Sequence, residues 1–225
     1  MRMNAIRAAI IALFTGGLML GASNAWSQPN QNPGVHPAAS TPYGVTYSEW
    51  AADWTDWGLS IPTAENPFLD PDGRFCQVDQ LPPVFFLGNN FGGSTVRHCN
   101  VPPGQSILFS PAGTLCVLHI DADTEEECRA SIEEVLQLIT NVAADVDGQP
   151  LQDLQSYRVI SGLFSLNLPS DNIFGLPPGQ YQAVAGGYFV MHTPLSAGQH
   201  VIHFHDEVPD FALVFDVTYV LNVGQ

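Results

Sequence analysis

The chain has 225 residues and a formal net charge of −16, with 22 Asp and Glu against six basic residues, all of which are Arg. A surface of this sign repels phosphate backbones and anionic lipid headgroups, which excludes nucleic acid and membrane surfaces as favoured partners. The length fits one β-rich domain.

Residues 1–27 have the pattern of a secretory signal peptide. Arg2 and Arg7 form a positive start, residues 8–20 are apolar, and small residues near 23–27 suit signal-peptide cleavage. The apolar run is too short to span a bilayer comfortably, and no later segment approaches its length. We therefore expect an exported protein, located in the periplasm or outside the cell.

Residues 28–42 are rich in Pro, Asn, Ser and Gly and have no apolar period, which predicts a flexible N-terminal arm. The folded part is then predicted to be a single domain over residues 43–225. Its first element is a helix, in which Thr46 and Glu49 form a capping box and Gly58 marks the end.

One face of this helix carries Tyr47 and three tryptophans, Trp50, Trp54 and Trp57. Indole faces are suitable platforms for stacking sugars, and Asp53 lies beside them to bond hydroxyl groups. A groove with these residues would bind carbohydrate or another neutral ligand. The alternative is an amphipathic helix that buries its aromatic side chains against the rest of the domain.

The middle of the chain contains strand candidates at 84–87, 107–109 and 115–120, and a second helix within 123–141 that Thr124 and Glu127 cap. Four further strands are predicted over 160–168, 181–191, 199–205 and 211–223, the last with the clearest alternation. The expected fold is mainly β: an antiparallel β-sandwich, jelly-roll or immunoglobulin-like, with two packed α-helices.

Four cysteines, Cys76, Cys99, Cys116 and Cys128, suggest two disulfides in an exported chain. Three pairings are possible. The sequential one, in which Cys76 pairs with Cys99 and Cys116 with Cys128, is favoured because each bond closes a short segment.

His203 and His205 alternate on one face of the strand 199–205, and Asp206 is expected to follow them in a turn. Imidazole and carboxylate groups together suit zinc, copper or iron, so a metal-dependent enzyme that also uses His119 or His192 is one alternative. Two half-exposed surface histidines are the other interpretation.

Asp70 and Asp72 precede Gly73 in a loop and offer oxygen ligands for calcium, although the spacing is not that of an EF-hand. A calcium-stabilised adhesion module is therefore a further alternative. No nucleophile elbow or catalytic triad pattern is present, so the leading hypothesis is a non-enzymatic binding or structural module.

The segments YGVTYSEW at 43–50, LSIP at 59–62 and PLSAGQHVIHF at 194–204 resemble the motifs of an uncharacterised family of exported bacterial proteins. The resemblance extends over nearly the whole chain after the signal peptide, and it implies export but no activity. It places His200 and His203 within the family pattern. His205 stands where a Gly-rich turn would be expected.

Overall fold

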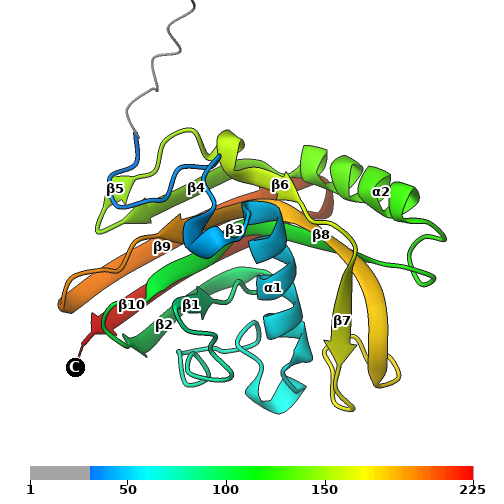
Figure 1. Cartoon of the computed structure of the whole chain (residues 1–225), viewed down its shortest axis with the longest axis horizontal. Coiled ribbons are helices and arrows are strands. Elements are labelled where there is room, and N and C mark those ends of the chain that lie inside the picture. The colour runs from blue at the N-terminus through cyan, green and yellow to red at the C-terminus, as the bar shows by residue number, and fades with distance from the viewer. Residues whose placement is uncertain (1–30, 225) are drawn as a thin grey trace, which may run out of the picture.

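The computed structural model describes residues 31–224, in which two β-sheets lie against each other with two helices beside them (Figure 1). The predicted signal peptide lies outside the described residues. Within residues 31–224, neither helix combines the length and the apolar character that crossing a lipid bilayer requires.

The first sheet contains five strands: β1 (Val84–Leu87), β3 (Ser106–Val117), β8 (Gly179–His192) and β6 (Arg158–Ile160) in this order, with β7 (Phe164–Leu168) also paired to β8. The second sheet has the order β2 (Gly93–Val101), β10 (Leu213–Val223), β9 (Gly198–Val208), β4 (Thr140–Val146) and β5 (Gln149–Pro150). The predicted β-sandwich with two helices is confirmed.

Each sheet contains one parallel pair, which corrects the expectation of purely antiparallel sheets. β1 runs parallel to β3, and β2 runs parallel to β10 along its whole length. Strand β2 was not predicted because its inward face carries Arg97 together with Cys99 and Val101, rather than an apolar series. A buried Arg disguises the alternation that marks a strand.

The two sheets meet through stacked aromatic rings. Phe109 of β3 stacks on Phe204 of β9 at a centroid distance of 5.5 Å, and Phe204 in turn stacks on Tyr219 of β10. These three side chains are at most 2% exposed. The core of the sandwich therefore lies where β3 crosses β9 and β10.

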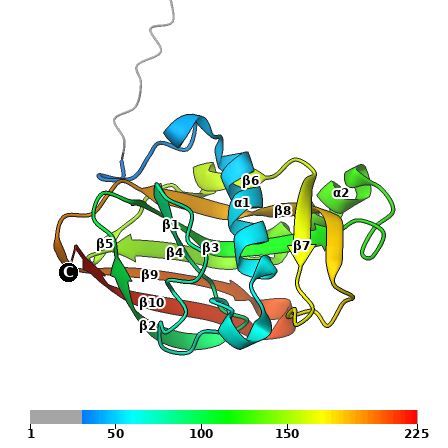
Figure 2. The ribbon, with the colours of Figure 1, turned by 60° about the horizontal axis from the view of Figure 1, so that its bottom comes forward.

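Helix α1 (Tyr47–Ser60) begins with the predicted capping box, in which the Thr46 amide donates to Glu49 Oε2 at 2.8 Å and the Glu49 amide donates to Thr46 Oγ1. It extends past Gly58. A Cβ at that position would lie only 2.1 Å from the ring of Phe68, so this glycine permits close packing and does not end the helix. Figure 2 shows α1 lying across the first sheet.

Helix α2 (Glu125–Leu138) has the second predicted capping box and packs on β3 and β8. The Cys116–Cys128 disulfide joins it to β3, and the Cys76–Cys99 disulfide joins the loop before β1 to β2. The sequential pairing is confirmed. Closing loops of this length by a disulfide stabilises a fold by about 3 kcal/mol each.

The described part of the predicted N-terminal arm lies against the domain. Val35 pairs with His192 of β8 and is 2% exposed, and the His36 amide donates to the Met191 carbonyl at 2.9 Å. The Asn32 side chain bonds the backbone of Gln152 in both directions. The prediction of a flexible arm is therefore wrong for residues 31–42, because backbone bonding to β8 replaces the missing apolar period.

Short 3₁₀ helices complete the chain at Pro42–Gly44, Thr63–Glu65, Leu154–Tyr157 and Pro209–Phe211. The last of these joins β9 to β10. The strand predicted over 211–223 therefore begins at Leu213, and its inward series continues through Val217, Tyr219, Leu221 and Val223.

Candidate functional site

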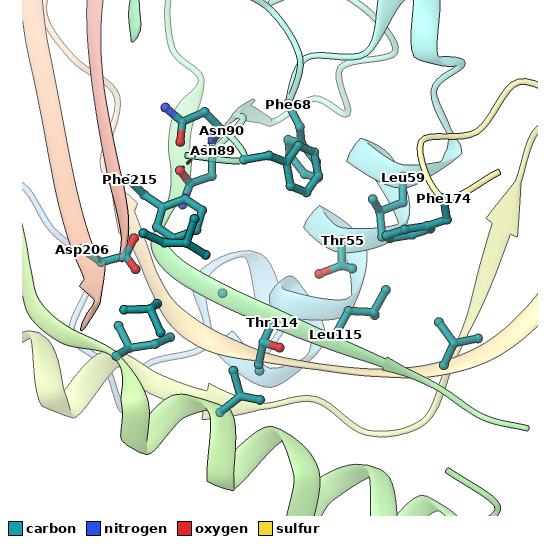
Figure 3. Close-up of a pocket in the computed structure, with 18 of the residues that line it drawn as sticks. Thr55, Leu59, Phe68, Asn89, Asn90, Thr114, Leu115, Phe174, Asp206 and Phe215 are labelled. Atoms are coloured by element: carbon teal, nitrogen blue, oxygen red, sulfur yellow. Dashed lines mark hydrogen bonds between the residues drawn. The ribbon is translucent and has the colours of Figure 1, made fainter. Parts of the chain in front are cut away.

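An opening beside β3 follows from the unequal lengths of two neighbouring strands. β1 ends at Leu87, opposite Phe109, whereas β3 continues to Val117. Beyond Phe109, no described strand lies along this edge of β3. A cavity of about 610 Å³ opens here (Figure 3), within the size range of small-molecule sites in proteins.

Both sheets and both helices contribute apolar walls to this cavity. On the side of α1 and the first sheet the lining includes Trp54, Leu59, Leu115 and Phe189. On the side of α2 and the second sheet it includes Val135, Ile139, Val208 and Phe215. Val135 and Ile139 lie on the face of the second helix that the sequence pattern predicted to be buried. They are only half-buried because they border this open space.

Large apolar side chains at the cavity remain exposed to solvent. Phe211 is 66% exposed, Phe91 54%, Phe174 43% and Leu213 40%. They come from three different loops and the start of β10. An exposed apolar cluster that continues into a cavity is a common mark of a binding site.

Most polar groups in the lining already have protein partners. The side-chain amides of Asn89 and Asn90 donate to backbone carbonyls, and so does the hydroxyl of Thr55. Asp121 accepts the Val117 amide at 2.8 Å. These groups shape the loops around the cavity.

Asp206 is the exception. It projects from β9 into the cavity (Figure 3), is only 3% exposed, and its Oδ1 is buried without any hydrogen-bond partner among the described residues. Burial raises the pKa of Asp206 to about 7, with nearby His205 lowering it and Glu207 raising it further. An unpaired buried carboxyl is costly to the fold, so a protein that keeps one has a candidate functional group.

The structure corrects the predicted tryptophan groove. Trp50, Trp54 and Trp57 are only 4–7% exposed, and each indole N–H donates to a backbone carbonyl. Trp54 is among the residues that line the cavity, whereas Trp50 and Trp57 belong to the core, and Asp53 is exposed outside the lining. The aromatic stripe therefore packs the domain and forms no open sugar platform.

The predicted set of His203, His205 and Asp206 is not brought together. β9 continues to Val208, so alternation places Asp206 on the inner face of the sheet and both histidines on the outer face. The expectation of a turn after His205 was wrong by three residues. Extending the alternation of Ile202 and Phe204 by one step would have placed an acid on the inner face.

On the outer face the two histidines alternate with carboxylates. His203 contacts Asp145 at 3.1 Å and Asp216 at 3.2 Å, and His205 contacts Asp216 and Glu207. We call these five residues the outer ladder. Across residues 31–224, no group of three or more His, Cys, Asp or Glu side chains is arranged to hold a metal ion.

The other two predicted partner histidines lie elsewhere. His192 is on β8 of the first sheet, where its Nδ1 lies 2.6 Å from the Thr193 carbonyl oxygen, and His119 lies in the turn after β3. Neither side chain forms a described contact with the outer ladder.

Asp70 and Asp72 are engaged in the loop that carries them. Asp70 is 2% exposed and accepts the amides of Asp72, Gly73 and Phe75. Asp72 forms a two-point ion pair with Arg74 at 2.6 and 2.9 Å. The predicted calcium ligands therefore hold this loop together through backbone hydrogen bonds and one ion pair.

No protein-family model and no curated protein matches the chain. Partial similarity exists to a chain from the structure of PbICP-C in complex with falcipain-2, at 8% identity and a TM-score of 0.23, covering 62% of this chain and 96% of that one. The solution structure of Amebosin is similar at 12% identity and a TM-score of 0.19, covering 58% and 95%. At these TM-scores neither similarity supports an argument about function.

Proposed function

We propose that this chain is an exported binding module that holds a small, largely apolar molecule in the cavity beside β3. The observation that carries the proposal is the cavity itself, which has the volume of a ligand site, apolar walls from both sheets and both helices, and an exposed apolar rim. Burying an apolar ligand there would release water from all of these surfaces.

Export is supported by independent features of the chain. The predicted signal peptide directs secretion, and the two disulfides are of the kind that form in oxidising compartments. Expression of the whole sequence in a bacterial host should yield a periplasmic protein whose first residue follows cleavage near residues 25–27. A protein retained in the cytoplasm with an intact N-terminus would contradict this part of the proposal.

Ligand binding is tested with an uncharged dye that fluoresces in apolar surroundings, such as Nile red. Leu115→Trp places a larger side chain in the cavity and should weaken dye binding at least about tenfold. Val96→Trp is the matched control, because Val96 is 54% exposed on β2 and outside the lining. Absence of saturable binding to the wild-type protein, or equal binding by Leu115→Trp, would overturn the proposal.

A further inference from the structure

The cavity contains one polar group that nothing in the described protein satisfies, the carboxyl of Asp206. It is 3% exposed, and its Oδ1 has no hydrogen-bond partner in residues 31–224. Replacing such a group by an apolar residue would remove the cost of burying it. Its retention at the wall of an apolar cavity indicates that a ligand supplies the missing donor.

The charges around the cavity indicate the sign of that donor. The lining contains two acids, Asp121 and Asp206, and no Arg or His. The Asp121 carboxylate already binds the Val117 amide, and the four Arg of the described residues are engaged elsewhere, for example Arg158 with Glu133 at 2.9 Å. An anionic ligand would meet only repulsion here, and the net charge of −16 attracts cations to the molecule.

We propose that the ligand is an amphipathic cation, in which an apolar body fills the cavity and a primary ammonium group donates to Asp206 Oδ1. This inference rests on the proposed function. A hydrogen bond between an ammonium group and a carboxylate is about twice as strong as a neutral one, and the burial of Asp206 strengthens it further.

The arrangement of the lining also gives the ligand a direction. Figure 3 shows Asp206 and Phe215 at one side of the cavity and Leu59 and Phe174 at the other, with Leu115 between them. The ammonium group would lie at β9, and the apolar body would extend past Leu115 toward α1. Phe174 is 43% exposed, so the far side of the ligand would reach the exposed rim.

Three ligands of equal length test the proposal: octylamine, 1-octanol and octanoate, each titrated at pH 8 against bound Nile red. At this pH the amine is protonated, since alkyl ammonium groups resemble Lys in pKa. We expect octylamine to bind at least about tenfold more tightly than 1-octanol, and octanoate to bind most weakly.

Asp206→Asn should bring octylamine to within about threefold of 1-octanol while leaving 1-octanol binding unchanged, which also shows that the variant is folded. Asp210→Asn is the matched control, because it removes one negative charge from an exposed position beyond β9 and should keep the amine preference.

The outcomes separate the two proposals. Equal binding of the amine and the alcohol by the wild-type protein, or an amine preference that survives Asp206→Asn, would overturn the cation inference alone. Failure of Nile red and of all three ligands to bind would overturn the proposed function, and the cation inference with it.

Discussion

Arg97 and Asp206 are both buried ionisable side chains on the inner face of the second sheet, but their surroundings differ completely. Arg97 donates to four backbone carbonyls and to the Tyr219 hydroxyl, and its guanidinium lies 5.5 Å from the centre of the Tyr219 ring. Asp206 Oδ1 has no partner among the described residues.

The difference separates a structural charge from a functional one. A buried charge in which every nitrogen donates a hydrogen bond holds its neighbours in one arrangement, as Arg97 does for the loops before and after β1. The backbone acceptors of Arg97 lie in residues 68–70 and 88–89, and the Cys76–Cys99 disulfide also ties the loop before β1 to β2. Asp206 holds no neighbours in this way, and its side chain faces the cavity instead.

Of the substitutions considered, replacing Arg97 should change the stability of the protein most. Arg97→Met should lower the free energy of unfolding by at least about 5 kcal/mol, because several buried acceptors lose their donor at roughly 1–3 kcal/mol each. The measurement is urea unfolding, with Arg74→Met as control, since the Arg74–Asp72 pair is exposed to solvent and its loss should hardly change stability.

A loss of this size can prevent folding altogether. Arg97→Lys therefore serves as a milder variant, because it keeps the charge but not the planar set of donors. Its free energy of unfolding should lie between those of Arg97→Met and the wild type. An Arg97→Met protein as stable as Arg74→Met would show that Arg97 is not a structural charge.

Asp206→Asn should instead raise the free energy of unfolding, and the size of this increase should depend on pH. Below pH 3.8, the usual pKa of the group, the carboxyl is protonated in the folded and the unfolded chain. As the pH rises toward 7 the unfolded chain loses this proton first, so the wild-type fold loses stability until both states are ionised.

The stability advantage of Asp206→Asn over the wild type should therefore grow by about 3 kcal/mol between pH 5 and pH 8 in the absence of ligand. Urea unfolding of both proteins at the two pH values measures this change. An advantage that stays constant, or one that shrinks toward pH 8, would mean that the carboxyl is already paired in the folded protein.

Substitutions in the outer ladder, whose two histidines lie on β9 with Asp206, should change the stability of the protein least. Burial opposes the charge on His203, but hydrogen bonds with Asp216 and Asp145 outweigh it and raise the pKa of His203 above 6.5. Its contribution to stability is therefore complete below pH 6.5 and is lost as the pH rises through the folded value. Because the side chain is 33% exposed, we expect about 1 kcal/mol or less.

His203→Asn should accordingly destabilise the protein slightly at pH 6 and hardly at all at pH 9, as measured by urea unfolding. His98→Asn changes an exposed imidazole on β2 and is the control. A cost of His203→Asn at pH 9 that exceeds its cost at pH 6 would show that the ladder does not stabilise the protein through a protonated histidine.

Much of the local structure could be predicted because its signals act over a few residues. Thr46 with Glu49, and Thr124 with Glu127, mark both helix starts correctly. The tryptophan stripe and the final strand were recognisable from their periods of 3.6 and 2. The function of the stripe was not, because an aromatic face can pack a core or line a groove with the same spacing.

The fold class and the two helices could be predicted from the sequence, and the correct cysteine pairing was favoured, since capping, periodicity and short loop closure are local. The site was decided by tertiary structure. That β1 stops opposite Phe109, and that β2 inserts Arg97 beside a strand more than a hundred residues away, are matters of long-range register. Only those pairings reveal which strand edge stays open and which buried carboxyl keeps no partner.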